Sequence, residues 1–133
     1  ENAASSGLSG APIRWLVDDC VKFVEREIRR GSRYDGIILD PPSYGRGPKG
    51  EIWKMEESIY PFISLTAQLL SKAPVFYLLN SYTTGLQPAV LSYMINSVIV
   101  KKCGGQVEAD EIGLPVTSSR LTLPCGASAR WCK

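Results

Sequence analysis

The stretch of sequence best suited to chemistry is DPPSY at residues 40–44, which follows an almost continuous apolar run. Its two prolines hold the backbone extended and lack N–H groups, so carbonyl oxygens beside the Asp40 carboxylate stay available as acceptors. Tyr44 lies two residues after the second proline and can stack on a flat ring. These groups suit the amino group of a nucleobase or a similar heterocycle. A turn in which Asp40 only bonds nearby backbone amides is the structural alternative.

Two further predicted strands end in polar side chains. One is predicted at residues 13–19 and ends in Asp18 and Asp19. The other is predicted at residues 74–81, ends in Asn80 and Ser81, and is followed by Tyr82. Ligands of open parallel sheets bind at the carboxyl ends of the strands. We therefore expect these side chains and Asp40 to line one edge of a sheet.

The elements that position these residues alternate along the chain. Besides the strands at 13–19 and 74–81, the pattern predicts a strand at 34–40 and helices at 20–31, 57–71 and 88–102. Two final strands, near 106–114 and 119–126, have no helix between them and predict an antiparallel hairpin. Alternation of this kind predicts an α/β fold with a mostly parallel sheet.

Composition excludes several classes of function. The chain has 133 residues with 44% apolar and 21% charged residues, which fits one ordinary domain. Its net charge of +2 does not mark it as a general polyanion binder, although a local basic patch is compatible with that value. Apolar runs are far shorter than the roughly 20 residues of a membrane span, and no signal peptide is visible. We expect a cytoplasmic protein with no membrane contact.

The cysteine pattern argues against metal and triad chemistry. The four cysteines include no C-x-x-C pair, and histidine is absent, so a structural zinc site is not expected. The same absence excludes a Ser-His-Asp triad or a Cys-His pair within this chain. We expect no metal and reduced thiols, as in the cytosol.

Basic residues cluster in two places. The loop around GRGPKG lacks the spacing of a phosphate-binding loop. Its Arg46, Lys49 and the following Lys54 can contact a nucleic-acid backbone, and a merely solvated loop is the alternative. Arginines in and just after the helix at 20–31 interleave with Glu25 and Glu27, which favours a solvated face. Trp53 is expected to pack beneath the loop.

The motif DPPSY resembles the Asp/Asn-Pro-Pro-aromatic motif of class I S-adenosylmethionine-dependent methyltransferases. The longer string at 13–54 and LPCGASARW at 123–131 resemble the bacterial group related to the large-subunit ribosomal RNA methyltransferases. The resemblance implies a Rossmann-like methyltransferase sheet, of which residues 1–133 form the C-terminal part. The family's first strands, with their Gly-rich loop and ribose-binding acidic residue, have no counterpart in this sequence.

The resemblance implies a cofactor side and a substrate side. Asp19 would accept a hydrogen bond from the adenine amine of S-adenosylmethionine, and the Cys20 amide would bond the adenine ring. Asp18 could share this role, although capping the helix at 20–31 is its expected function. The residues facing the transferred methyl group and the substrate would be Asp40, Pro41 and Pro42. Tyr44 would stack on the target base, and Asn80, Ser81 and Tyr82 would line the substrate side of the pocket. Arg46 and Lys49 of the basic loop are the further expected substrate contacts.

The implied activity is methyl transfer from S-adenosylmethionine to a base in RNA, with ribosomal RNA favoured. Family members that methylate cytosine C5 use a cysteine where this chain has Ser43 and Asn80-Ser81, so direct, non-covalent transfer is expected. A catalytically inactive nucleic-acid-binding module on the same fold is the alternative. An oxidoreductase is disfavoured because no Gly-rich fingerprint is present. The chain alone is expected to lack activity and to associate through an exposed sheet edge.

Overall fold

The structure is a computed structural model that describes residues 1–47 and 50–133. Its helices are α1 (Asn2–Ser5), α2 (Cys20–Arg30), α3 (Met55–Thr66), η1 (Ala67–Leu69), α4 (Pro88–Ile95), η2 (Asn96–Val100) and α5 (Lys101–Cys103). Its strands are β1 (Gly36–Leu39), β2 (Tyr44–Arg46), β3 (Ile52–Lys54), β4 (Phe76–Ser81), β5 (Gln106–Val116) and β6 (Leu121–Cys132). The α/β architecture that the sequence predicts is therefore confirmed.

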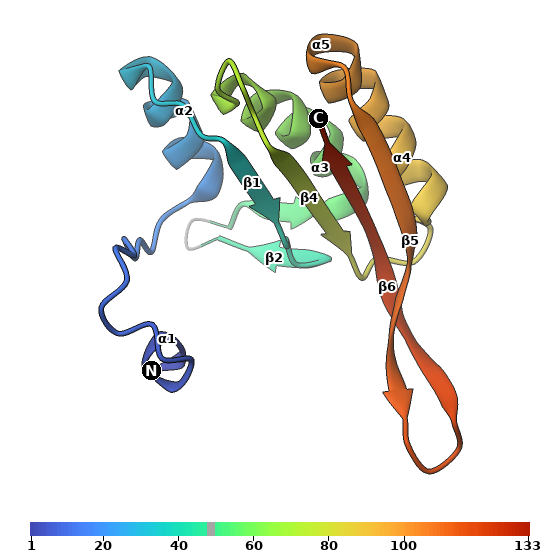
Figure 1. The fold of residues 1–133 in the computed structure, drawn as a ribbon. Coiled ribbons are helices and arrows are strands. Elements are labelled where there is room, and N and C mark those ends of the chain that lie inside the picture. The colour runs from blue at the N-terminus through green and yellow to red at the C-terminus, as the bar shows by residue number, and fades with distance from the viewer. Residues whose placement is uncertain (48–49) are drawn as a thin grey trace.

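Four strands form the main sheet in the order β1-β4-β6-β5 (Figure 1). β1 and β4 are parallel, whereas β6 runs antiparallel to both β4 and β5. The predicted C-terminal hairpin is confirmed, but the sheet is mixed rather than mostly parallel. β2 and β3 form a separate antiparallel pair within the loop that follows β1.

One face of the sheet carries the core. Alternate residues of β4 and β6 point toward α3 and the helical stretch that begins at α4. The residues with less than 2% exposure on this face and these helices include Ile59, Ile63, Tyr77, Leu79, Leu91, Ile95, Ile99 and Trp131. A second cluster joins Val24 of α2 to Phe62 and Leu69, against Ile37 and Leu39 of β1. The helices thus fix β1 and β4 side by side.

The opposite face of the sheet carries no helix among the described residues (Figure 1). Ile38 of β1 is 60% exposed there. On the far half of the same face, Arg130 of β6 forms an ion pair of 2.7 Å with Glu108 of β5. This face is therefore apolar near β1 and charged near β5.

The predicted strand at 13–19 is wrong. These residues form no helix or strand, and Trp15 is 72% exposed while Val17 is fully exposed. A strand requires a neighbour that completes its backbone hydrogen bonds. No strand lies beside this segment among the residues that the structure describes, so its apolar run forms no strand and stays exposed.

Local signals explain where α2 and the helical stretch that starts at α4 begin and end. Asp19 caps α2 by accepting from the Lys22 amide, and Gly31 ends the helix with a positive φ of 74°. Pro88 is the first residue of α4, and the helical stretch continues through a π-helical turn to Cys103, as predicted. Among the described residues, no helix is long and apolar enough to cross a membrane.

A buried carboxylate ties α2 to the start of β1. Glu27, expected on a solvated face, is only 4% exposed. The Tyr34 hydroxyl lies 2.6 Å from one carboxylate oxygen, and the Arg30 guanidinium lies 2.9 Å from the other. The Tyr34 hydrogen bond, followed by those of Ser32 and Arg30, lowers the pKa of Glu27 to about 2. The Glu27 carboxylate therefore stabilises the folded state while it is ionised.

The stability of the fold should depend on the ionisation of Glu27. Its folded pKa of about 2 lies below the ordinary value of 4.5, so its contribution is complete above pH 4.5 and is lost as pH falls toward 2. Glu27→Gln should lower the free energy of unfolding at pH 7 and flatten its fall between pH 4.5 and 2. Urea denaturation across this range measures both effects. Glu25→Gln on the exposed face is the control, and equal pH profiles for Glu27→Gln and the parent protein would contradict the assignment.

Candidate functional site

The site begins where β1 and β4 end together. Their parallel register places Leu39 opposite Leu79, so the next residues, Asp40 and Asn80, are neighbours at the same end of the sheet. The Asn80 amide nitrogen lies 3.4 Å from a carboxylate oxygen of Asp40. The predicted meeting of these two strand ends is confirmed.

A third strand holds Asn80 in place. Ser128 of β6 lies opposite Asn80, and its hydroxyl lies 2.8 Å from the Asn80 side-chain oxygen. This bond directs the amide nitrogen of Asn80 toward Asp40, because the reverse orientation would place an amide oxygen against a carboxylate. Sequence reasoning missed Ser128, although it lies within LPCGASARW. Its role depends on the register between β4 and β6, which the sequence pattern does not specify.

Tyr82 approaches Asp40 from the chain that follows β4. A hydrogen bond to Asp40 raises the pKa of Tyr82, with burial and the negative charge of Asp40 acting in the same direction. The Asp40 carboxylate therefore lies beside the Asn80 amide and within the electrostatic influence of the Tyr82 phenol, both from one short segment. Such a carboxylate has a fixed orientation and keeps acceptor capacity for a further donor.

Of the two prolines after Asp40, only Pro42 has a carbonyl that accepts a hydrogen bond from a described residue. The Pro42 carbonyl accepts a hydrogen bond of 2.8 Å from the indole nitrogen of Trp53, so it is not free as the sequence suggested. Trp53 packs edge-on against Phe62, with ring centroids 5.9 Å apart, as expected for a tryptophan beneath the loop. No described donor lies within hydrogen-bonding distance of the Pro41 carbonyl, which is the free acceptor of the pair.

The other predicted substrate residues lie on the β2–β3 pair. Tyr44 is 54% exposed and pairs across the ladder with Lys54. Lys54 also forms an ion pair of 2.8 Å with Glu57, so its charge is partly compensated. Arg46 is exposed at the end of β2, and Lys49 lies outside the described residues.

The predicted cofactor residues lie at the start of α2. Asp19 rather than Asp18 caps this helix, because the Asp19 carboxylate lies 3.1 Å from the Lys22 amide. Asp18 instead pairs with Arg26, whose hydrogen bond lowers the pKa of Asp18. No contact among the described residues joins Asp18 or Asp19 to Asp40. Cys20 is the first residue of α2, and its thiol is exposed and free.

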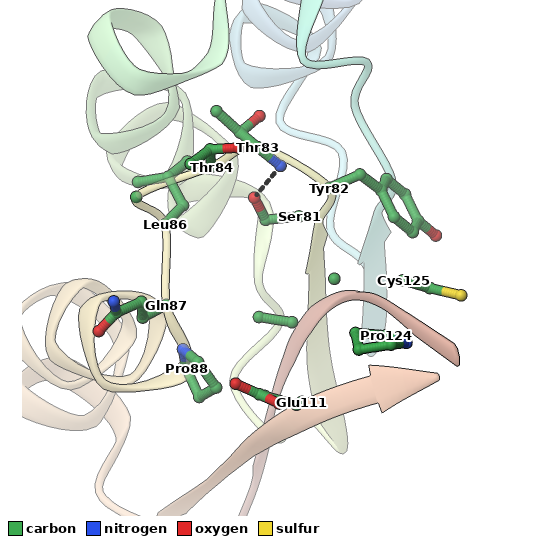
Figure 2. Close-up of a pocket in the computed structure, with 13 residues that line it drawn as sticks. Ser81, Tyr82, Thr83, Thr84, Leu86, Gln87, Pro88, Glu111, Pro124 and Cys125 are labelled. Carbon is green, nitrogen blue, oxygen red and sulfur yellow. Dashed lines mark hydrogen bonds between the residues drawn. The ribbon is translucent and has the colours of Figure 1, made fainter. Parts of the chain in front are cut away.

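A groove of about 410 Å³ opens beside this site (Figure 2). One wall is the segment from the end of β4 to the start of α4, and the other is the base of the β5–β6 hairpin. Ser81 is buried, and its hydroxyl accepts from the Thr83 amide in the turn that forms the first wall. Tyr82 is among the residues that line the groove, and it directly follows Ser81 of the first wall.

Within the described residues, no group of three or more His, Cys, Asp or Glu side chains converges on a point. All four cysteines are free. The chemistry offered by the site is that of an oriented carboxylate and a backbone carbonyl beside exposed aromatic rings.

Comparison with solved structures identifies the fold. The chain shares 31% identity with a SAM-dependent methyltransferase from Agrobacterium tumefaciens, with a TM-score of 0.85 over 99% of this chain and 44% of that one. A candidate SAM-dependent methyltransferase from Streptococcus mutans gives 16% identity and a TM-score of 0.70, over 98% and 34% of the two chains. A candidate methyltransferase complexed with SAH gives 19% identity and a TM-score of 0.67, over 97% and 34%.

One of these neighbours is a SAM-dependent methyltransferase and the other two are candidate methyltransferases, so the methyltransferase-like α/β fold that the sequence indicated is confirmed. The chain spans less than half the length of each of them. No family model and no curated protein sequence matches the chain.

The Trp53 hydrogen bond should contribute measurably to stability. Trp53→Phe keeps an aromatic ring against Phe62 but removes the donor to the Pro42 carbonyl, which should cost about 1 kcal/mol of unfolding free energy. Urea denaturation at neutral pH measures the change. Trp15→Phe is the matched control, because Trp15 is exposed and should change stability by less than about 0.5 kcal/mol. Equal effects of the two substitutions would contradict the role of the indole bond.

Proposed function

We propose that this chain is part of a class I S-adenosylmethionine-dependent methyltransferase that methylates a base in RNA. The observation that carries the proposal is the Asp40 carboxylate, which lies beside the Asn80 amide at the shared end of β1 and β4. The 31% identity to the Agrobacterium methyltransferase over nearly the whole chain supports the reaction class. The string at 13–54, which resembles the ribosomal RNA methyltransferases, supports RNA as the substrate.

The residues of the proposed site would act by positioning an amine. The Asp40 carboxylate and the free Pro41 carbonyl would accept hydrogen bonds from the acceptor amine and stabilise the positive charge that develops on it. Ser128 and Asn80 would keep the carboxylate in one orientation. Tyr44 offers an exposed ring for stacking, and Arg46 an exposed cation for the RNA backbone.

The start of α2 fits one part of S-adenosylmethionine, which when bound supplies an activated methyl group. Asp19 uses one carboxylate oxygen to cap the helix, and its other oxygen lies 3.7 Å from the exposed Lys22 ammonium. The second oxygen can accept from the adenine amine, while amides of the first turn of α2 lack intrahelical partners and can donate to the ring. We assign no described residue to the methionine and ribose ends of the cofactor.

Replacing Asp40 tests the proposed activity. In the protein that contains this chain, Asp40→Asn should lower the methyl-transfer rate at least about 100-fold without changing the melting temperature. Single-turnover transfer of labelled methyl groups to RNA is the measurement. Asp35→Asn, at the opposite end of β1, is the control. Near-normal turnover in Asp40→Asn would refute its role, and RNA binding without any transfer by the parent protein would favour the inactive binding module.

Replacing Asp19 separates its two roles. Asparagine caps helices as well as aspartate does, so Asp19→Asn should leave the free energy of unfolding within about 0.5 kcal/mol of the parent value. It should nevertheless weaken S-adenosylmethionine binding by about 1–3 kcal/mol, because a carboxylate acceptor is lost. Calorimetric titration of the cofactor measures this effect, with Asp18→Asn as the control. An unchanged dissociation constant in Asp19→Asn would rule out the adenine contact.

A further inference from the structure

The groove beside Tyr82 has the size and position of a second ligand site. Its volume of about 410 Å³ falls within the range of small-molecule sites. It opens at the end of β4, the same end of the sheet as Asp40. Ser81 and Tyr82, which line the groove, directly follow Asn80, whose amide lies beside Asp40. A molecule held at Asp40 can therefore extend into the groove.

The groove carries one formal charge among its lining residues. Glu111 projects from β5 beside Pro88, at the first turn of α4 (Figure 2). No described donor lies within hydrogen-bonding distance of its carboxylate, and Glu111 is exposed. A carboxylate repels phosphate, so this groove does not follow the RNA backbone. It favours a neutral group that presents N–H donors.

The remaining walls suit a flat ring. Leu86, Pro88 and Pro124 supply apolar surface, and the turn after β4 supplies hydroxyl groups at Thr83 and Thr84 (Figure 2). Gly126 keeps the two walls together, because a Cβ at this position would lie 2.2 Å from the Ser81 carbonyl oxygen. Among its lining residues, the groove therefore combines an apolar slot and neutral hydroxyl groups with one carboxylate at its edge.

We infer that this groove binds a second base of the RNA, adjacent to the base held at Asp40, and that Glu111 selects guanine. Guanine presents two neighbouring N–H donors, from its ring and its exocyclic amine, and these match the two oxygens of a carboxylate. Adenine and cytosine present one amine, and uracil presents a single ring N–H. The inference rests on the proposed function for the identity of the partner, but not on methyl transfer itself.

Nucleotide titration tests the groove directly. The protein is titrated with GMP and with IMP, which lacks the exocyclic amine but carries the same phosphate, and backbone resonances of Thr83, Gly85 and Gly126 are followed by NMR. We expect GMP to bind about tenfold more tightly than IMP. Glu111→Gln should remove this preference. Glu108→Gln should retain it, because Glu108 pairs with Arg130 on the other face.

The outcomes separate this site from a structural role of Glu111 and from the proposed reaction. Equal preference for GMP over IMP in the parent protein and in Glu111→Gln would overturn the inference, as would the absence of groove shifts at millimolar GMP. If Glu111 has only a structural role, Glu111→Gln would alter the free energy of unfolding without altering the difference in affinity between GMP and IMP. If Asp40→Asn retained full methyl transfer, the proposed function would fail while the nucleotide preference could still stand.

Discussion

The site depends on the parallel pairing of β1 with β4. A parallel pair brings two carboxyl ends to the same place, and here the register sets Asp40 beside Asn80. A shift of one residue would turn Asp40 away from its partner and reverse the faces of Ile37 and Leu39. The core enforces the register, because these two residues pack with Val24, Phe62 and Leu69 from the helices. Packing on one face of the sheet thus determines the geometry of the site at its end.

The strand ends with the clearest patterns could be predicted from the sequence, whereas contacts that depend on register could not. The Asp40 and Asn80 strand ends follow from apolar runs bounded by turn residues. Ser128 could not be placed, because its contact with Asn80 depends on the antiparallel register between β4 and β6. The same difficulty applies to the Pro42 carbonyl, whose partner Trp53 comes from a short strand formed within a loop.

The error at residues 13–19 has a different cause. The segment has the composition of a strand. A strand also needs a neighbouring strand to pair with, and composition does not show whether that neighbour is present. The sequence pattern therefore places its two final carboxylates at a strand end, whereas in the structure both contact the first turns of α2. There, backbone conformation decides the cap: Asp19 is extended, with ψ of 116°, and its side chain reaches the Lys22 amide.

The β5–β6 hairpin is longer than the sheet to which it belongs. β4 pairs with β6 only from Ala127 to Cys132, whereas β6 begins at Leu121 and pairs with β5 along its full length. The distal half is thus a two-stranded ribbon that projects beyond the sheet (Figure 1). The ribbon joins the rest of the sheet next to Gly126 and Ser128. A molecule that displaced the tip of the hairpin would therefore move Gly126 at the groove and Ser128 at Asn80.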